Sequence, residues 1–174
     1  MDSSVSYSTR KEIEVHSFSG AVTLLVPLAA ILLQAFVSLR IPMFRVFDLP
    51  LLVTIFFAVA RRNPIAGSVT GALIGTGQDA ASGLPVGING IANTVVGYFA
   101  SSISVKIDVE NPGSRLIMIF GFKLLHDVIG YLVQSRILGN DLLYRTRYEL
   151  GSALANAVLG VALFGLLDRL KQRR

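Results

Sequence analysis

The chain has 174 residues, of which 52% are hydrophobic and 16% are charged, and its formal net charge is +5. Soluble globular domains usually contain about a quarter charged residues, so this composition indicates a membrane protein. The basic residues lie between apolar runs and at the termini rather than in one stripe, which argues against nucleic-acid binding. The absence of cysteine excludes disulfides and thiol chemistry.

The apolar runs predict an all-α fold of six transmembrane helices within residues 20–168, between tails at residues 1–19 and 169–174. The first span covers residues 20–39. A cleaved signal peptide is the alternative for this segment, but no small-residue cleavage site precedes Arg40. The uncharged run at residues 49–60 covers only about 18 Å of helix. Residues 43–47 are therefore assigned to the same second span, with Arg45 and Asp48 at the membrane interface.

The third span, residues 64–82, contains the most distinctive motif of the chain. A glycine or an aspartate recurs at every fourth position: Gly67, Gly71, Gly75, Asp79, Gly83 and Gly87. Residues four apart lie nearly above one another on a helix, so the first four form one stripe. Glycines in a membrane helix let a neighbouring backbone approach closely. We expect a close-packed helix that ends in a carboxylate, followed by a turn at residues 83–85.

The remaining spans are predicted at residues 85–104, 116–133 and 148–167, and each carries polar residues on one face. With six spans, ten Lys and Arg residues lie on the side of the two termini and five lie on the opposite side. The positive-inside rule then places both termini in the cytoplasm.

A rise of 1.5 Å per residue brings polar side chains of five spans into one layer, in the half of the membrane away from the termini. These residues, with Asp79, form the predicted intramembrane polar network: Gln34, Asn93, Lys123, His126, Asp127 and Asn156. The layer either holds the bundle together or lines a polar chamber, and both interpretations stay open. A Lys123–Asp127 pair offsets part of the cost of burying charge. We expect Lys123 to neutralise one buried carboxylate while the two asparagines satisfy the other.

Catalytic signals are absent from the sequence. It contains no Ser/His/Asp spacing, no metal-ligand cluster and no phosphate-binding loop. The glycine-rich segment lacks both the Lys-Ser/Thr ending and the preceding strand of such a loop. We therefore expect a protein without enzymatic activity, metal or cofactor.

Six short spans, a basic tail and the Gly75-x3-Asp79-x3-Gly83-x3-Gly87 motif resemble MreD, a family of rod shape-determining membrane proteins. Members typically carry a Gly-x3-Asp at the end of the third span and an aspartate in a later span, to which Asp127 corresponds. The resemblance implies a bacterial inner-membrane protein with the fold of substrate-binding subunits of energy-coupling-factor transporters. It also implies a non-enzymatic role in cell shape and lateral peptidoglycan synthesis. The implied partners are MreC and, indirectly, MreB and the wall-synthesising glycosyltransferase and transpeptidase pair.

The alternative is a substrate-binding subunit of such a vitamin transporter, which an outward-facing polar chamber would suit. Those subunits usually carry Ala-x3-Ala on the first span for docking the coupling subunit. The alanines of the first span are never four residues apart: Ala21, Ala29, Ala30 and Ala35. This pattern favours the shape protein over the transporter subunit. A structural scaffold without a family function is the third possibility.

Overall fold

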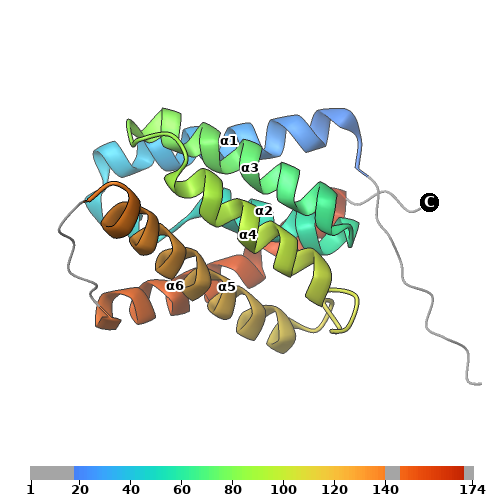
Figure 1. Cartoon of the computed structure of the whole chain (residues 1–174). Helices are drawn as coiled ribbons and strands as arrows, with labels where there is room; N and C mark the ends of the chain where they lie inside the picture. The colour runs from blue at the N-terminus through green and yellow to red at the C-terminus, as the bar shows by residue number, and fades with distance from the viewer. Residues whose placement is uncertain (1–17, 140–145, 171–174) are drawn as a thin grey trace, which may run out of the picture.

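The computed structural model describes residues 18–139 and 146–170, and this part of the chain is all-helical (Figure 1). It contains six α-helices: α1 Gly20–Arg40, α2 Leu49–Arg61, α3 Pro64–Ser82, α4 Ile88–Ile103, α5 Pro112–Leu132 and α6 Thr146–Leu167. Three short turns of other helix types accompany them: η1 Pro42–Val46, η2 Val133–Ile137 and η3 Asp168–Leu170. The prediction of six helices is confirmed, and the predicted bounds of the third span match α3.

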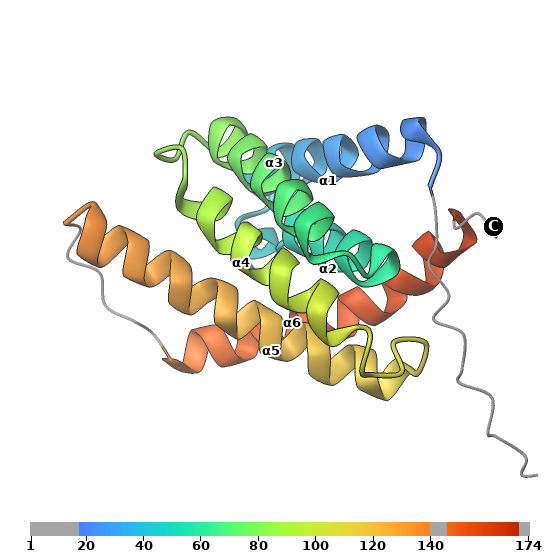
Figure 2. The same cartoon turned by 45° about the vertical axis from the view of Figure 1, so that its right-hand side comes forward.

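Four segments of the described chain are long and apolar enough to cross a membrane: Gly20–Arg40, Pro42–Arg61, Pro112–Ile137 and Thr146–Leu170. α4 has only 16 residues, about 24 Å of helix. α3 has 19 residues, but its glycine, serine and threonine residues make it less apolar than the other helices. Both nevertheless lie in the same bundle as the four apolar helices (Figures 1 and 2).

α2 occupies the centre of the bundle. Every one of its residues from Pro50 to Ala60 is buried, as expected for a helix that is hydrophobic all round. The sequence alone allowed this helix to face lipid or a partner, and the structure surrounds it with the other helices instead. In its core, Phe56 packs edge-on against Phe164 of α6, with ring centroids 5.3 Å apart.

Phe18, the second-last residue of the predicted N-terminal tail, is half-buried and packs against this core. Its ring centroid lies 5.0 Å from that of Phe57 and 5.7 Å from that of Phe56. Ser19 then caps α1 by accepting a hydrogen bond from the amide of Val22 at 3.3 Å. The rest of the predicted N-terminal tail, residues 1–17, lies outside the described residues, as do residues 171–174 of the C-terminal tail.

The start of α1 and the end of α6 lie at the same end of the bundle (Figures 1 and 2). At this end Arg61 of α2 donates hydrogen bonds to Thr23 of α1 at 3.0 Å and to Thr70 of α3 at 3.1 Å. Arg115 of α5 forms an ion pair with Asp168, directly after α6, at 2.8 Å. The helices therefore alternate in direction and bring the start of α1 and the end of α6 to one end of the bundle (Figures 1 and 2).

The second predicted span is not one continuous helix. η1 ends at Val46, Phe47 is extended, and α2 begins after Asp48. Asp48 caps α2 by accepting a hydrogen bond from the amide of Leu51 at 3.2 Å, and Pro50 occupies the first turn. Aspartate at the cap and proline in the first turn are typical helix-start residues. The prediction of one continuous helix is therefore wrong, and Asp48 is buried within the bundle at the break. The position of Asp48 at the membrane interface stays a prediction.

Candidate functional site

The glycine motif holds α3 and α4 in backbone contact. On α3, Gly67, Gly71 and Gly75 face the backbone of α4. A Cβ atom at Gly71 would lie 2.1 Å from the carbonyl oxygen of Asn93, and one at Gly75 would lie 2.3 Å from that of Asn89. Real Cβ atoms essentially never approach other atoms within 3.0 Å, so these positions require glycine. The predicted packing role of the stripe is confirmed.

The last members of the motif shape the turn into α4. Gly83 and Gly87 have φ angles of 67° and 117°, in the left-handed region that favours glycine. Asp79 is fully buried, and its carboxylate accepts hydrogen bonds from the backbone amides of Gly87 (2.8 Å), Asn89 (3.1 Å) and Gly90 (3.2 Å). The side-chain amide of Asn89 donates a further bond at 2.8 Å. Asp79 thus caps α4 from another helix, where amides lack intrahelical partners and the helix dipole favours an anion.

This arrangement corrects the predicted partners of Asp79. Asn93 donates to the side-chain oxygen of Gln78 at 3.4 Å, and Asn156 donates to backbone carbonyl groups on α6 and before α2. The free amides of the first turn of α4 surround the carboxylate, whereas Asn93 lies one turn further along that helix. Asp79 and Asp127 accordingly bind separate sets of partners rather than sharing one network.

Gln34 of α1 forms hydrogen bonds with backbone groups on both sides of Asp48, where the helix is interrupted before α2. Its side-chain amide donates to the carbonyl oxygen of Phe47 at 2.9 Å, and its side-chain oxygen accepts from the amide of Leu49 at 3.2 Å. Both backbone groups lie where the helix is interrupted. Irregular backbone at membrane depth is stable only where the protein buries it and satisfies its polar groups. Gln34 therefore has a structural role within the predicted polar layer.

Asn156 of α6 forms hydrogen bonds with other backbone groups of the same interrupted segment. It donates to the carbonyl oxygen of Val46 at 2.8 Å and accepts from the amide of Asp48 at 2.8 Å. The hydroxyl of Ser152, one turn earlier on α6, also donates to the carbonyl of Val46, at 2.7 Å. Gln34 on α1 and Asn156 on α6, both predicted network residues, thus hold the segment between η1 and α2 in place.

Asp48 connects this segment to the rest of the polar layer. Its Oδ1 atom accepts a hydrogen bond from the side-chain amide of Gln78 on α3 at 3.0 Å. Gln78 in turn accepts from Asn93 on α4. His126 Nδ1 on α5 lies 3.9 Å from Asp48 Oδ2. Polar side chains of α3, α4 and α5 are thus connected through Asp48 rather than through Lys123, and the depth of this layer in a membrane stays a prediction.

Lys123 and Asp127 on α5 form the predicted ion pair, with side chains only 8% and 9% exposed. His126 Nδ1 lies 3.4 Å from the same Asp127 oxygen that Lys123 binds. Within the described chain, the second oxygen, Asp127 Oδ2, and His126 Nε2 are buried and have no hydrogen-bond partner. This part of the layer therefore retains hydrogen-bonding capacity that the protein itself does not use.

A cavity of about 400 Å³ lies beside the ion pair, between the start of α4, the end of α5 and the start of α6. Its volume falls in the range typical of small-molecule sites. The carboxyl group of Glu149 on α6 adjoins Asp127 at its wall. Seven residues with charged, amide or imidazole side chains line it: Asp48, Asn89, Lys123, His126, Asp127, Gln134 and Glu149. The other lining residues are Leu84, Ile88, Gly130 and Tyr131.

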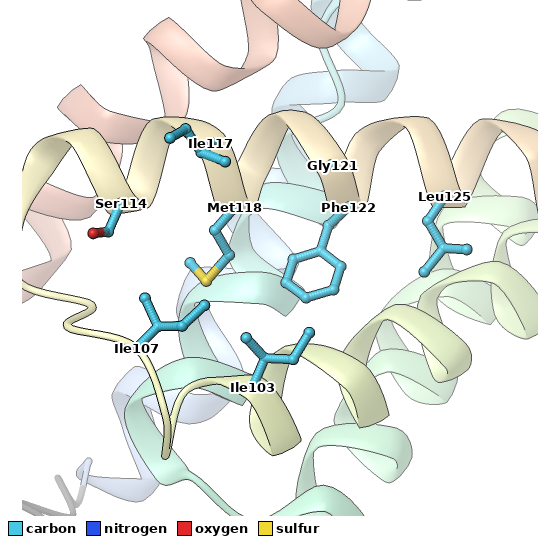
Figure 3. Close-up of a pocket in the computed structure, with 8 residues that line it drawn as sticks. All are labelled: Ile103, Ile107, Ser114, Ile117, Met118, Gly121, Phe122 and Leu125. Atoms are coloured by element: carbon cyan, nitrogen blue, oxygen red, sulfur yellow. The ribbon is translucent and has the colours of Figure 1, made fainter.

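A second cavity, of about 390 Å³, lies toward the opposite end of the bundle, between the end of α4 and α5 (Figure 3). The side chains of Ile103, Met118 and Phe122 point into it, and Ser114 is the one polar residue among its lining (Figure 3). Such a wall favours hydrocarbon, and the Ser114 hydroxyl is the one polar side-chain group that it offers. None of the predicted site residues lines this cavity.

The sequence-based prediction missed four members of the polar layer: Asp48, Gln78, Ser152 and Glu149. Asp48 carried a usable signal, because aspartate followed closely by proline is typical of a helix start. Ser152 shares a helix face with Asn156, four residues later. Gln78 and Glu149 carried no comparable signal, since their roles depend on which neighbouring helices they meet.

No protein family model, curated protein or solved structure matches the chain. Across residues 18–139 and 146–170, no group of three or more His, Asp or Glu side chains is arranged to hold a metal ion. The inference of function therefore rests on the α3–α4 hairpin, the polar layer and the pattern of the sequence.

Proposed function

We propose that this chain is a non-enzymatic scaffold of the MreD type in the bacterial cytoplasmic membrane. It crosses the membrane six times, with both termini in the cytoplasm, and it binds MreC. Through MreC it contributes indirectly to the arrangement of MreB filaments and of the glycosyltransferase and transpeptidase pair that extends the cell wall. The Gly75-x3-Asp79-x3-Gly83-x3-Gly87 motif and the layout of six short helices support this assignment.

One observation carries the proposal: several buried or half-buried polar side chains hold helix ends in place. Asp79 caps α4, Asp48 caps α2, and Gln34 and Asn156 close the break between η1 and α2. A catalytic site instead needs a nucleophile or acid–base pair presented to a substrate. Hydrogen bonds that fix helix positions support a bundle that serves as a rigid docking partner.

The α3–α4 hairpin is also suited to membrane depth. Its two helices pack through glycines, and the carboxylate of Asp79 satisfies amides that lipid could not. The distribution of Lys and Arg supports the cytoplasmic placement of both termini. These features support six spans even though α3 is less apolar than the other helices and α4 has only 16 residues.

Co-purification with cognate MreC tests the proposal. The full-length, detergent-solubilised protein is expected to retain co-expressed MreC at near-equal stoichiometry. Gly75→Leu, which forces α3 away from α4, should lose MreC. Gly165→Leu on α6 is the matched control, because a Cβ atom there meets no atom within 4 Å. Failure of the wild-type protein to retain MreC would contradict the assignment.

The cavity of about 400 Å³ favours one alternative, the substrate-binding subunit of a vitamin transporter. That function requires saturable binding of a vitamin and no stable complex with MreC. Titration of the purified protein with riboflavin and biotin separates the two functions. Tight binding of either vitamin, together with loss of MreC during purification, would replace the MreD proposal by this alternative.

A further inference from the structure

The polar cavity contains more acidic than basic side chains. Asp48, Asp127 and Glu149 supply three carboxyl groups, and Lys123 is the one Lys or Arg among its lining residues. The ammonium group of Lys123 is already bound to Asp127 Oδ1. A cavity with this balance attracts a positively charged group, and low-dielectric walls strengthen the attraction.

Two buried atoms at this wall have no hydrogen-bond partner among the described residues: His126 Nε2 and Asp127 Oδ2. His126 Nδ1, on the other side of the ring, lies 3.4 Å from an oxygen of Asp127 and 3.9 Å from one of Asp48. Asp127 Oδ2 is an acceptor in a side chain that is nine-tenths buried. The carboxyl group of Glu149 lies within hydrogen-bond reach of Asp127, and two carboxyl groups this close favour a shared proton or a cation between them.

The adjacent carboxyl groups of Asp127 and Glu149 can both accept hydrogen bonds from a primary ammonium group, which carries three N–H donors. The cavity also offers the apolar side chains of Leu84 and Ile88 to the body of a ligand. Its volume of about 400 Å³ exceeds what an ion alone would fill. The cavity thus combines acidic side chains, a hydrogen-bond acceptor that lacks a donor, and space for a small organic molecule.

We propose that this cavity is a binding site for a small organic cation that carries a primary ammonium group. The ammonium lies against Asp127, Glu149 and His126, and the carbon skeleton lies against Leu84 and Ile88. The site does not depend on the proposed interaction with MreC, and it needs no metal. Binding would add a bridge between α5 and α6, which carry Asp127 and Glu149, and would stabilise that end of the bundle.

Calorimetric titration of the full-length protein in lipid nanodiscs tests this site. The probes are methylammonium, butylammonium and 2-phenylethylammonium, and the neutral control is 1-butanol. At least one amine should bind saturably below about 10 mM, the weak end of specific recognition, whereas butanol should not. Glu149→Gln should weaken binding of that amine about tenfold, while Glu110→Gln, on an exposed turn outside the cavity, should leave it unchanged.

A second variant places a cationic side chain of the protein in the cavity. Gln134→Lys places an ammonium group at the cavity wall, so the folded variant should lose amine binding and unfold at a higher temperature than Gln134→Met. The headgroup of phosphatidylethanolamine offers the same ammonium chemistry. Nanodiscs with and without this lipid distinguish the sources, because a bound headgroup would raise the apparent dissociation constant of the amine.

The proposal is overturned if none of the three amines binds saturably, or if butanol binds as well as butylammonium. It is equally overturned if Glu149→Gln and Gln134→Lys both fold and bind the amine as the wild-type protein does. Circular dichroism of each variant establishes that it is folded before titration.

Discussion

Asp79→Ala is expected to destabilise the protein by about 3–5 kcal/mol, because it leaves four donors at the start of α4 without an acceptor. A hydrogen bond to a charged group contributes about 1.5–3 kcal/mol. The simple sum overstates the loss, since Gly87 and Asn89 are half-exposed and can bind water instead. Gly90 is buried and cannot do so readily.

Asp79→Asn refines this prediction. One side-chain oxygen remains to accept the two bonds from Asn89, but the new NH2 group faces the amides of Gly87 and Gly90. Two donor–donor contacts replace two hydrogen bonds, so about half of the loss should remain. Asn89→Ala removes one bond and should be the mildest of the three changes.

Thermal unfolding of the full-length protein in detergent, followed by circular dichroism, measures these effects. For a chain of this size about 2–4 °C corresponds to 1 kcal/mol, so Asp79→Ala should lower the unfolding midpoint by about 10 °C. Asp79→Asn should fall between Asp79→Ala and the wild-type protein. A midpoint for Asp79→Asn equal to that of the wild type would refute the capping role of the negative charge.

Two further predictions use the same assay. Gly71→Ala should destabilise the bundle by about 1–3 kcal/mol through the contact with Asn93, whereas Gly165→Ala, with open space around it, should be neutral or stabilising. Equal midpoints for these variants would mean that α3 and α4 are not in backbone contact. Lys123→Met should destabilise more than Lys123→Met combined with Asp127→Leu, because the single variant leaves an unpaired buried carboxylate. Strictly additive effects in that cycle would show that the two side chains do not interact.

Features with local causes were predictable from the sequence. The bounds of α3 follow from Pro64 in its first turn and Gly83 directly after its last. The glycine stripe requires only helical periodicity and the tendency of glycine to admit close backbones. The Lys123–Asp127 pair likewise depends on a spacing of four residues within one helix.

Features that depend on distant segments were not predictable. Asp48 and Asn156 form a hydrogen bond across 108 positions of sequence, and nothing near either residue indicates the other. The asparagines were assigned to Asp79 by depth alone, whereas the amides of the α4 first turn lie closer in sequence and in space. The apolar run at residues 51–60 fits lipid and protein core equally, so only complete packing places α2 at the centre.

Cysteine accessibility tests most directly the central claim that the α3–α4 hairpin crosses the membrane with the other helices. The chain has no cysteine, so Val86→Cys in the α3–α4 turn and Glu110→Cys before α5 each give a single reactive site. Both positions are exposed. In intact cells a membrane-impermeant maleimide should label Val86→Cys, whereas Glu110→Cys should react only after permeabilisation. Labelling of both sites, or of neither, from outside would place the turn and residue 110 on one side and contradict the six-span bundle.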